Sequence, residues 1–370
     1  MKFTRQVLTQ TLDFSASGSD QISIGQTSFW LIGMELALTL AKTDGTSPTT
    51  TQDFFARPIT GLSLASGDFA PFISINSPNV RSLYWHERLK NQGRLMGPSM
   101  AAGSVSMRWL LPIFFGVNPV KVDDAMHVKD VTAAIKPSSD LTLSVNWSAA
   151  GSTTGTGGPI GDYRAIGTTT KVRVTLYGVE LEAGDTPPAY MPHIYSTNWQ
   201  PGQTYSGYDG IVSLEPGFLY RRSTVLVRNG AAPADLRLDG LNSDAISQIG
   251  IFAFDGRPVL KQQFVDFVRH SQAQFQVADD NAALAEGGSV GATAAYGTPT
   301  VACDYNPGVG MIDWLDFPST NAPAGMKAGA DPLYGIDMRG KDKGAVKIGF
   351  TVDASTNTNV DLLHEAYLPY

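Results

Sequence analysis

The feature that most restricts the fold of this 370-residue chain is a repeated order of short β-like runs in its two halves. Matched blocks are separated by 189 residues for the first two pairs, 205 for the next two and 188 for the last. Gly-rich insertions at 277–300 and at 149–168 account for the two changes in spacing. The pattern predicts a duplicated domain. The matched positions are Phe29 with Phe218, Gly61 with Gly250, Trp109 with Trp314, Leu141 with Val346 and Val172 with Val360.

Several of these runs alternate apolar and polar residues, as in the segment 141–147 with Leu141, Leu143 and Val145. Alternation places the apolar side chains on one face and is typical of half-buried antiparallel strands. With 38 Gly and 22 Pro, the chain leaves little room for long helices. The predicted fold class is all-β. The predicted runs are 6–14, 29–40, 59–64, 72–75, 107–115, 141–147 and 171–181, then 217–227, 246–254, 311–317, 345–352 and 360–367.

Each half also carries one short helical pattern between its second and third matched strands. Apolar residues recur at i, i+3 and i+4, which places them on one face of a helix. Ser77 and Pro78 form a plausible helix start in the first half, and Pro258 precedes the second pattern. We therefore expect one short helix against each sandwich. The two apolar triplets are Val80, Leu83 and Tyr84, and Phe264, Phe267 and Val268.

The predicted boundary between the halves lies at 186–202, a segment with four prolines. A Pro-rich joint is stiff, so we expect two domains, 1–190 and 191–370, held in a fixed relation.

Composition excludes several classes of protein. Charged residues make up 16% of the chain and hydrophobic residues 42%, which allows a large core and argues against disorder. The net charge of −7 argues against sequence-specific nucleic-acid binding, which needs a basic surface. The single Cys303 rules out a disulfide framework within the chain and a Cys-rich zinc site.

The sequence offers no recognisable catalytic constellation, so we predict no catalytic residue, cofactor or metal site. The histidines lack metal-ligand spacing. The Gly-rich segment 155–161 lacks the Lys-Ser/Thr of a phosphate loop, and the acidic segment 239–244 lacks the spacing of an EF-hand, which leaves only incidental calcium binding there. The histidines are His86, His127, His193, His270 and His364.

Trp109 and Trp314 occupy matched places in the two halves, each shortly before a proline. A tryptophan can fill a sandwich core or form a platform for a sugar. Ligand sites need not be duplicated, so equivalent placement favours the core.

Two tandem antiparallel sandwiches of similar length, each with a helix in the same inter-strand loop and joined stiffly in an acidic chain, resemble the double jelly-roll major capsid proteins. These belong to tailless icosahedral viruses such as the corticoviruses, tectiviruses and adenoviruses, many of which have an internal membrane. The resemblance covers the whole chain and rests on architecture, with no functional residue carried over.

The resemblance implies two eight-stranded jelly rolls per chain and a homotrimer that forms a pseudo-hexagonal tile of the virus shell. The partners it implies are neighbouring trimers, vertex and minor capsid proteins and an internal membrane, in a virion assembled in the host cytoplasm. Few charges and scattered aromatics suit a subunit whose flanks become interface. A corticovirus-like or tectivirus-like bacteriophage is the expected source of such a chain.

Two other classes remain open at this stage. A carbohydrate-active or carbohydrate-binding protein would need carboxylates beside aromatic platforms, and the sequence contains such carboxylates without showing that they converge. A receptor-binding or adhesin protein would also be β-rich and non-enzymatic. The candidate carboxylates are Glu35, Asp53, Glu180 and Glu182.

The N-terminus carries two basic residues, Lys2 and Arg5, in an otherwise acidic chain. We expect them at the inner face of a shell subunit, where they would contact an anionic membrane. The opening residues lack the apolar region of a secretory signal, and the apolar stretch 29–41 contains Glu35 and is too short for a membrane span. Export by this route is therefore not expected.

Overall fold

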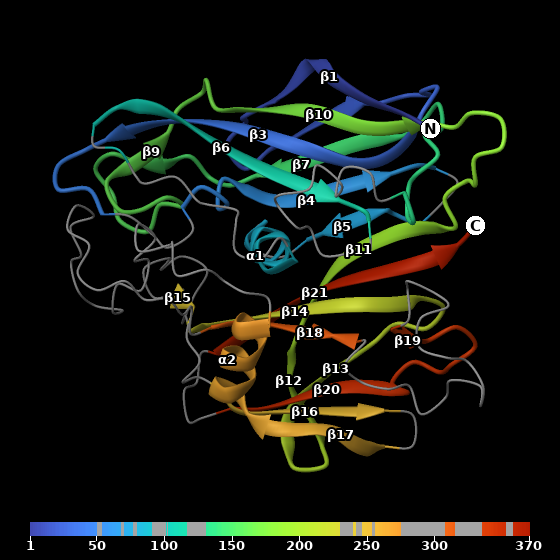
Figure 1. Cartoon of the computed structure of the whole chain (residues 1–370). Helices are drawn as coiled ribbons and strands as arrows, with labels where there is room; N and C mark the ends of the chain where they lie inside the picture. Colours follow the sequence, from blue (N-terminus) through green and yellow to red (C-terminus); the bar gives the residue numbers. More distant parts are fainter. Residues whose placement is uncertain are drawn as a thin grey trace.

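A computed structural model describes residues 1–49, 54–67, 70–76, 80–90, 101, 103–116, 131–229, 240–241, 246–253, 256–274, 308–314, 335–352 and 358–370. All structural statements concern these residues. Several positions singled out from the sequence lie outside them: Asp53, the predicted helix start Ser77 and Pro78, His127, Cys303, the insertion 277–300, and the segment 239–244 apart from Gly240 and Leu241. The strands form two sandwiches, one above the other in Figure 1.

The first sandwich pairs two antiparallel sheets over a common core. Its outer sheet has the order β1, β10, β3, β6, and its inner sheet the order β2, β7, β4, β5. Short strands β8 (Gly151–Ser152) and β9 (Arg164–Ile166), from the predicted insertion 149–168, extend the outer sheet beside β3. The main strands are β1 (Lys2–Asp13), β2 (Ser19–Ser23), β3 (Trp30–Asp44), β4 (Ile59–Ala65), β5 (Ile73–Ile75), β6 (Val105–Phe114), β7 (Thr142–Trp147) and β10 (Lys171–Glu180).

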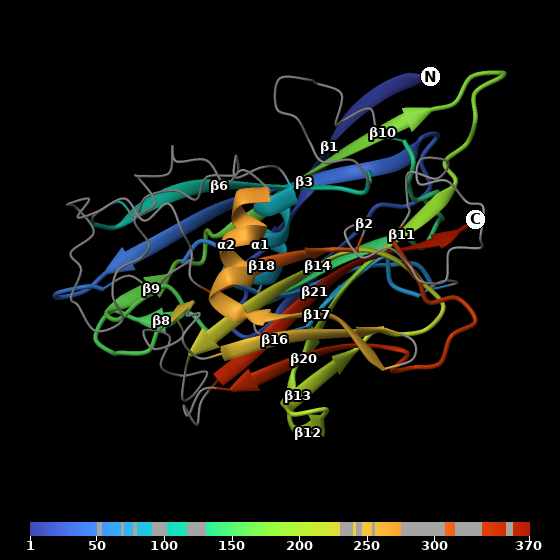
Figure 2. The ribbon, with the colours of Figure 1, turned by 60° about the horizontal axis from the view of Figure 1, so that its bottom comes forward.

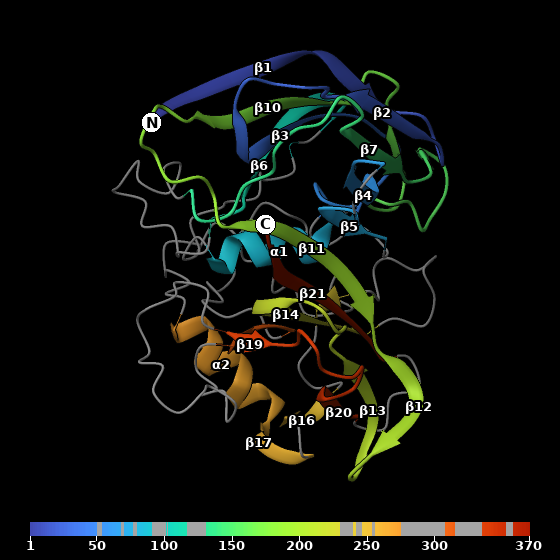
Figure 3. The same ribbon diagram turned by 90° about the vertical axis from the view of Figure 1, so that its right-hand side faces the viewer.

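The second sandwich repeats this arrangement strand for strand. One sheet has the order β11, β21, β14, β18 and the other β13, β20, β16, β17. Short strands β15 (Gly240–Leu241) and β19 (Ile336–Asp337) pair with β14, and β12 (Gln200–Tyr205) forms with β13 a hairpin that projects from the sandwich (Figures 2 and 3). The main strands are β11 (Tyr190–Asn198), β13 (Tyr208–Ser213), β14 (Leu219–Asn229), β16 (Ile246–Ala253), β17 (Arg257–Gln263), β18 (Val309–Asp313), β20 (Val346–Val352) and β21 (Thr358–Pro369).

The shared strand order is that of a jelly roll, so the all-β prediction of two eight-stranded jelly rolls is confirmed. The repeat extends to a β-bulge. Between β10 and β3 the register shifts where Tyr177 lies opposite Gly33, and between β21 and β14 it shifts where Glu365 lies opposite Arg222. Tyr177 and Glu365 lie 188 residues apart, and Gly33 and Arg222 lie 189 apart. The matched blocks of the sequence predict the same separations for these strands.

The register corrects the predicted match of Trp109 with Trp314. Gly33 pairs with Phe114 on β6, and the equivalent Arg222 pairs with Asp313 on β18, so Phe115 is the counterpart of Trp314. The sequence match placed two tryptophans together because identical residue types stood near one another in short strands of unequal length. Both tryptophans are nonetheless buried, as a core role requires.

Both predicted helices are present. Helix α1 (Arg81–Lys90) follows β5, and α2 (Phe264–Gln274) follows β17. Helix α2 packs on β16, β17 and β18 of its own sandwich, whereas α1 also packs on β14, β18 and β21 of the other sandwich (Figures 1 and 3). Neither described helix has the length and apolar character needed to cross a membrane.

The two sandwiches share a sheet as well as a helix. Strand β11, which lies inside the predicted Pro-rich boundary segment, pairs with β21 and also runs parallel to β5 through Ile194 opposite Ile73. The inner sheet of the first sandwich therefore continues into the second. Neighbouring residues of β21 face different cores, since Leu362 packs in the core of the second sandwich and Leu363 in the core of the first. A rigid connection between the halves follows.

Candidate functional site

The most unusual local feature is that helix α1 is buried along its whole length although six of its ten residues are polar or charged. Charged side chains are almost never fully buried unless they are paired. Here the helix lies between the two sandwiches and contacts β6 on one side and β14, β18 and β21 on the other. We call this contact, formed by α1 with the facing side chains of β14, β18 and β21, the helix joint.

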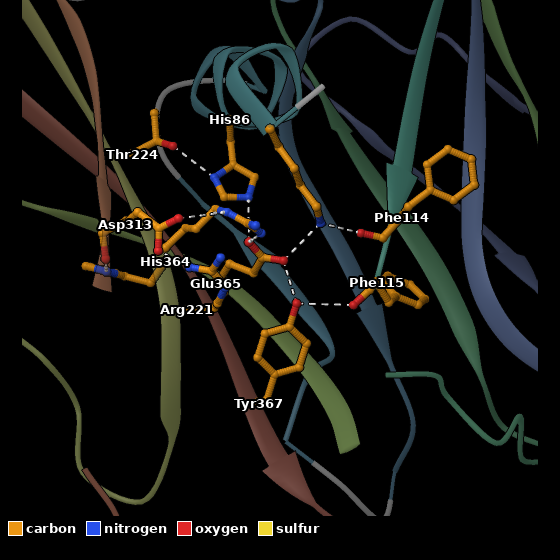
Figure 4. A network of polar contacts seen from close by, with 12 residues as sticks. His86, Phe114, Phe115, Arg221, Thr224, Asp313, His364, Glu365 and Tyr367 are labelled. Atoms are coloured by element: carbon orange, nitrogen blue, oxygen red, sulfur yellow. Dashed lines mark hydrogen bonds and ion pairs between the residues drawn. The ribbon is translucent and has the colours of Figure 1, made fainter. Parts of the chain in front are cut away.

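Glu365 of β21 lies at the centre of the helix joint and is 1% exposed (Figure 4). Its Oε1 accepts a hydrogen bond from Lys90 Nζ of α1 at 2.9 Å, and its Oε2 accepts one from Arg222 Nη1 of β14 at 2.9 Å. Burial alone would raise the pKa of Glu365, but the charges of Lys90 and Arg222 outweigh it and hold the pKa well below its usual range. The carboxylate is therefore ionised and ties two strands of one sandwich to the helix of the other.

Main-chain carbonyl groups at and just after the end of β6 complete the hydrogen-bond network around Glu365. Lys90 Nζ also donates to the carbonyl oxygen of Phe114 at 2.7 Å. The hydroxyl group of Tyr367 lies within hydrogen-bond distance of Glu365 Oε1 and, at 3.1 Å, of the carbonyl oxygen of Phe115, and shares its single proton between them. The network thus reaches the first sandwich through both α1 and β6 (Figure 4).

His86 is the second residue of α1 that contacts the opposite sheet. Its Nδ1 lies 2.9 Å from Thr224 Oγ1 of β14, and its Nε2 lies 3.4 Å from Glu365 Oε2. Burial lowers the pKa of His86, so the ring is neutral at pH 7. A neutral ring with its proton on Nε2 accepts a hydrogen bond from the Thr224 hydroxyl at Nδ1 and directs its own N–H toward the Glu365 carboxylate.

A parallel network lies on the other side of the same strands, inside the second sandwich. Trp314 Nε1 donates to Ser223 Oγ at 2.9 Å, and Ser223 Oγ lies 2.8 Å from His364 Nδ1. His364 Nε2 lies 2.9 Å from Thr197 Oγ1 of β11. Burial lowers the pKa of His364 to about 3, so the neutral ring accepts from Ser223 and donates to Thr197. This chain of hydrogen bonds fixes β11, β14 and β21 beneath the helix joint.

The geometry of the helix joint is that of a structural contact. Its central side chains are closed from solvent, with His86, Lys90 and Arg222 all essentially unexposed. Arg221 pairs with Asp313 of β18, which adds a further buried ion pair beside the centre. Within the described part of the chain, no group of three or more His, Cys, Asp or Glu side chains is placed to hold a metal ion. The helix joint therefore fixes the angle between the two sandwiches.

Sequence reasoning missed this site. The sequence does contain one sign of it. The predicted strand 217–227 includes the polar run Arg222, Ser223 and Thr224, and the predicted strand 360–367 includes His364 and Glu365. Such residues are normally assigned to a solvated face. Only the register of β14 with β21, which sets Arg222 opposite Glu365, places them together.

The structure places Lys2 and Arg5 on edge strand β1, exposed but beside carboxylates. Lys2 Nζ lies 3.5 Å from Glu180 Oε2, and Arg5 lies 3.7 Å from Glu35 Oε1. The N-terminal amino group contacts Glu182 at 2.8 Å. Three of the candidate carboxylates thus surround the first residues of the chain, and contact of Lys2 and Arg5 with a membrane stays a prediction.

The other candidates from the sequence lie apart from one another. His193 is half-buried and its Nδ1 lies 2.6 Å from the carbonyl oxygen of Pro71, whereas His270 is exposed on α2. In the Gly-rich segment 155–161, the Gly157 amide donates to Asp162 Oδ1 at 2.7 Å, which makes it a structured surface loop.

No family model and no curated protein matches the chain. Solved structures match it along its whole length. The crystal structure of the STIV major capsid protein aligns with a TM-score of 0.66 at 14% identity and covers 100% of this chain and 97% of that one. The PBCV-1 virus capsid aligns with a TM-score of 0.54 at 11% identity, covering 99% and 94%, and the Faustovirus major capsid protein with 0.52 at 10%, covering 100% and 90%. The chain therefore has the double jelly-roll fold found in these capsid proteins.

Replacing Glu365 by Gln should destabilise the protein by about 3–5 kcal/mol, because Lys90 and Arg222 would remain buried without their counter-charge. Denaturant unfolding followed by circular dichroism measures the change. The matched control is Glu215→Gln, whose exposed pair with Lys343 is worth about 0–1 kcal/mol. Equal effects of the two substitutions would show that the helix joint does not stabilise the fold.

The free energy of unfolding should fall as the pH is lowered from about 6.5 toward 3, because the unfolded chain binds a proton at His364 that the folded chain excludes. One such proton corresponds to about 1.4 kcal/mol per pH unit. His364→Gln, which can keep both hydrogen bonds, should reduce the slope by one proton. Thr197→Val should lower stability without changing the slope. An unchanged slope in the His364 variant would refute the assignment.

Proposed function

We propose that this protein is the major capsid protein of an icosahedral virus and has a structural, not an enzymatic, role. The observation that supports this most strongly is that two jelly rolls with one strand order align over the whole chain with major capsid proteins, in both directions of coverage. The closed helix joint adds to it, because a shell tile needs its two domains at a constant angle.

Three copies would form the tile. Six jelly rolls in a ring give a pseudo-hexagonal outline, and the low fraction of charged residues, 16%, suits a subunit whose flanks are buried between copies. We place the domain division at 1–190 and 191–370. The end of β10 at Glu180 and the start of β11 at Tyr190 support that division.

The rival functions have less support. A carbohydrate site would need carboxylates that face an aromatic platform, whereas Glu35 and Glu180 lie beside cations of β1, and Trp109 and Trp314 are buried in the cores. A receptor-binding or adhesin role has no particular residue in its favour. The capsid function accounts for both sandwiches at once.

The proposed location is the virion, after assembly in the host cytoplasm, with vertex and minor capsid proteins as further partners. An internal membrane would lie below the tile. Lys2 and Arg5 are exposed enough to reach it, although Glu180 and Glu35 reduce the local positive charge.

In solution the chain should sediment as a trimer at micromolar concentration, and moderate salt should leave the trimer intact because apolar contacts are little screened. Analytical ultracentrifugation over a range of salt concentrations measures this. A salt-sensitive monomer would contradict the capsid proposal, and a saccharide-dependent rise in melting temperature would favour the carbohydrate-binding alternative.

For membrane contact, the double variant Lys2→Gln and Arg5→Gln should keep the trimer but float less with anionic liposomes, since each basic residue near an anionic surface contributes at most about 1 kcal/mol. Vesicles of neutral lipid are the control. Unchanged flotation with anionic vesicles would reject this role for the N-terminus.

A further inference from the structure

Within the described part of the chain, no helix covers the equivalent surface of the first sandwich. In the second sandwich, the face of β11, β21, β14 and β18 that points away from its own core is covered by α1 and the first sandwich. In the first sandwich, the corresponding face of β1, β10, β3 and β6 points outward (Figure 1). We call the latter the open face; its residues are Phe3, Arg5, Val7, Glu35, Leu110, Pro112 and Tyr177.

The shared register identifies the counterparts residue by residue. Tyr177 is the counterpart of Glu365, and Glu35 is the counterpart of Thr224. Leu110 of β6 corresponds to Val309 of β18, because both lie four residues before the position that pairs with Gly33 or Arg222. The exposure differs sharply, since Val309 is fully buried and Leu110 is 52% exposed. A position buried by a helix in one sandwich is thus uncovered in the other.

The open face is apolar at its margin and polar at its centre, like the face beneath α1. Val7 is 50% exposed and Phe3 37% exposed, and both flank Arg5 on β1. At the centre the Tyr177 hydroxyl donates to Glu35 Oε2 at 3.3 Å. One end of the same face is already closed by the chain itself, where Ala134 packs with Ile32 and Val179. Among the described apolar residues of this face, Leu110 and Val7 are the most exposed.

Helix α2 presents the matching element. Its apolar triplet Phe264, Phe267 and Val268 corresponds to Val80, Leu83 and Tyr84 of the α1 segment, a separation of 184 residues. The same separation makes His270 the counterpart of His86, and Gln274 the counterpart of Lys90. His86 and Lys90 are buried in the helix joint, whereas His270 and Gln274 are exposed. Helix α2 therefore carries the two docking positions of α1 on a surface that no described segment covers.

We propose that α2 of one copy of this chain docks on the open face of a second copy and repeats there the helix joint formed within each chain. His270 would lie against Glu35, as His86 lies against Thr224, and Gln274 against Tyr177, as Lys90 lies against Glu365. Asp266 and Arg269 of α2 are exposed, and the open face carries Arg5 and Glu35, so both surfaces bear charges of both signs. The inference rests on the proposed function and names the surface that three copies use.

This contact joins different surfaces of two copies, and such a head-to-tail contact produces either a closed ring or an open filament. Each chain contributes one joint within itself and one to its neighbour. Three chains would then give a ring of six jelly rolls with the same contact at every step. The symmetry of the tile would follow directly from the duplication in the sequence.

A disulfide between copies tests the contact directly. In a Cys303→Ser background, Glu35→Cys together with His270→Cys should give covalently linked dimers and trimers on mild oxidation, resolved on a non-reducing gel. The matched control pairs Glu35→Cys with Ser206→Cys, an exposed position in the turn between β12 and β13, and should remain uncrosslinked. Mixing the two single-cysteine variants should give linked dimers only. Equal crosslinking by the control pair would overturn the inference.

A second variant guards against a false negative from disulfide geometry. Leu110→Asp places a charge on the exposed apolar part of the open face and should raise the dissociation constant of the trimer at least tenfold, with the monomer still folded by circular dichroism. Ser206→Asp, at the exposed turn between β12 and β13, should leave the trimer unchanged. If the wild-type chain is a trimer that Leu110→Asp does not weaken and no specific crosslink forms, this inference fails while the capsid proposal stands. A wild-type monomer would instead defeat the capsid proposal.

Discussion

The structure depends on one buried carboxylate. Glu365 lies between Lys90 and Arg222 with almost no exposure, and a buried charge is tolerated only when its partners are held at hydrogen-bond distance. Because Lys90 comes from the first sandwich and Arg222 from the second, keeping Glu365 paired requires one relative position of the two domains. The shared sheet through β5 and β11 and the alternate burial of Leu362 and Leu363 act in the same direction.

Much of the fold could be predicted from the sequence because its physical signals are local. Alternation in 141–147 gave β7, and the apolar triplets at Val80 and Phe264 gave the two helices. Of the main strands, β2, β11, β13 and β17 were missed. Strands β11, β13 and β17 contain Pro or Gly, and β2 has a single apolar residue. In addition, β2, β11 and β13 pair with strands that are distant in sequence. The predicted repeat has the correct order of strands, but its match of Trp109 with Trp314 is wrong. Strand register is set by backbone pairing and not by residue identity.

The helix joint could not be predicted, because each of its members has an ordinary explanation in isolation. A helix with His86, Glu87 and Lys90 is typical of a solvated surface helix, and nothing local shows that a second domain covers it. Lys2 and Arg5 drew attention as isolated cations, yet their neighbours Glu180 and Glu35 come from strands more distant in sequence. Polar burial is a property of the assembled pair of domains. The duplication carries the same two elements to α2 and to the open face, which are the surfaces proposed for contact between copies.

The measurement that tests the central claim most directly is an electron cryomicroscopy reconstruction of the purified oligomer. The structure predicts a closed ring of three chains with a pseudo-hexagonal outline, in which six helix-on-sheet contacts alternate between those within a chain through α1 and those between chains through α2. A monomer, or an oligomer without that outline, would contradict the assignment as a shell tile. A pseudo-hexagonal trimer in which α2 and the strands β1, β10, β3 and β6 of neighbouring copies lie apart would contradict the repetition of the helix joint.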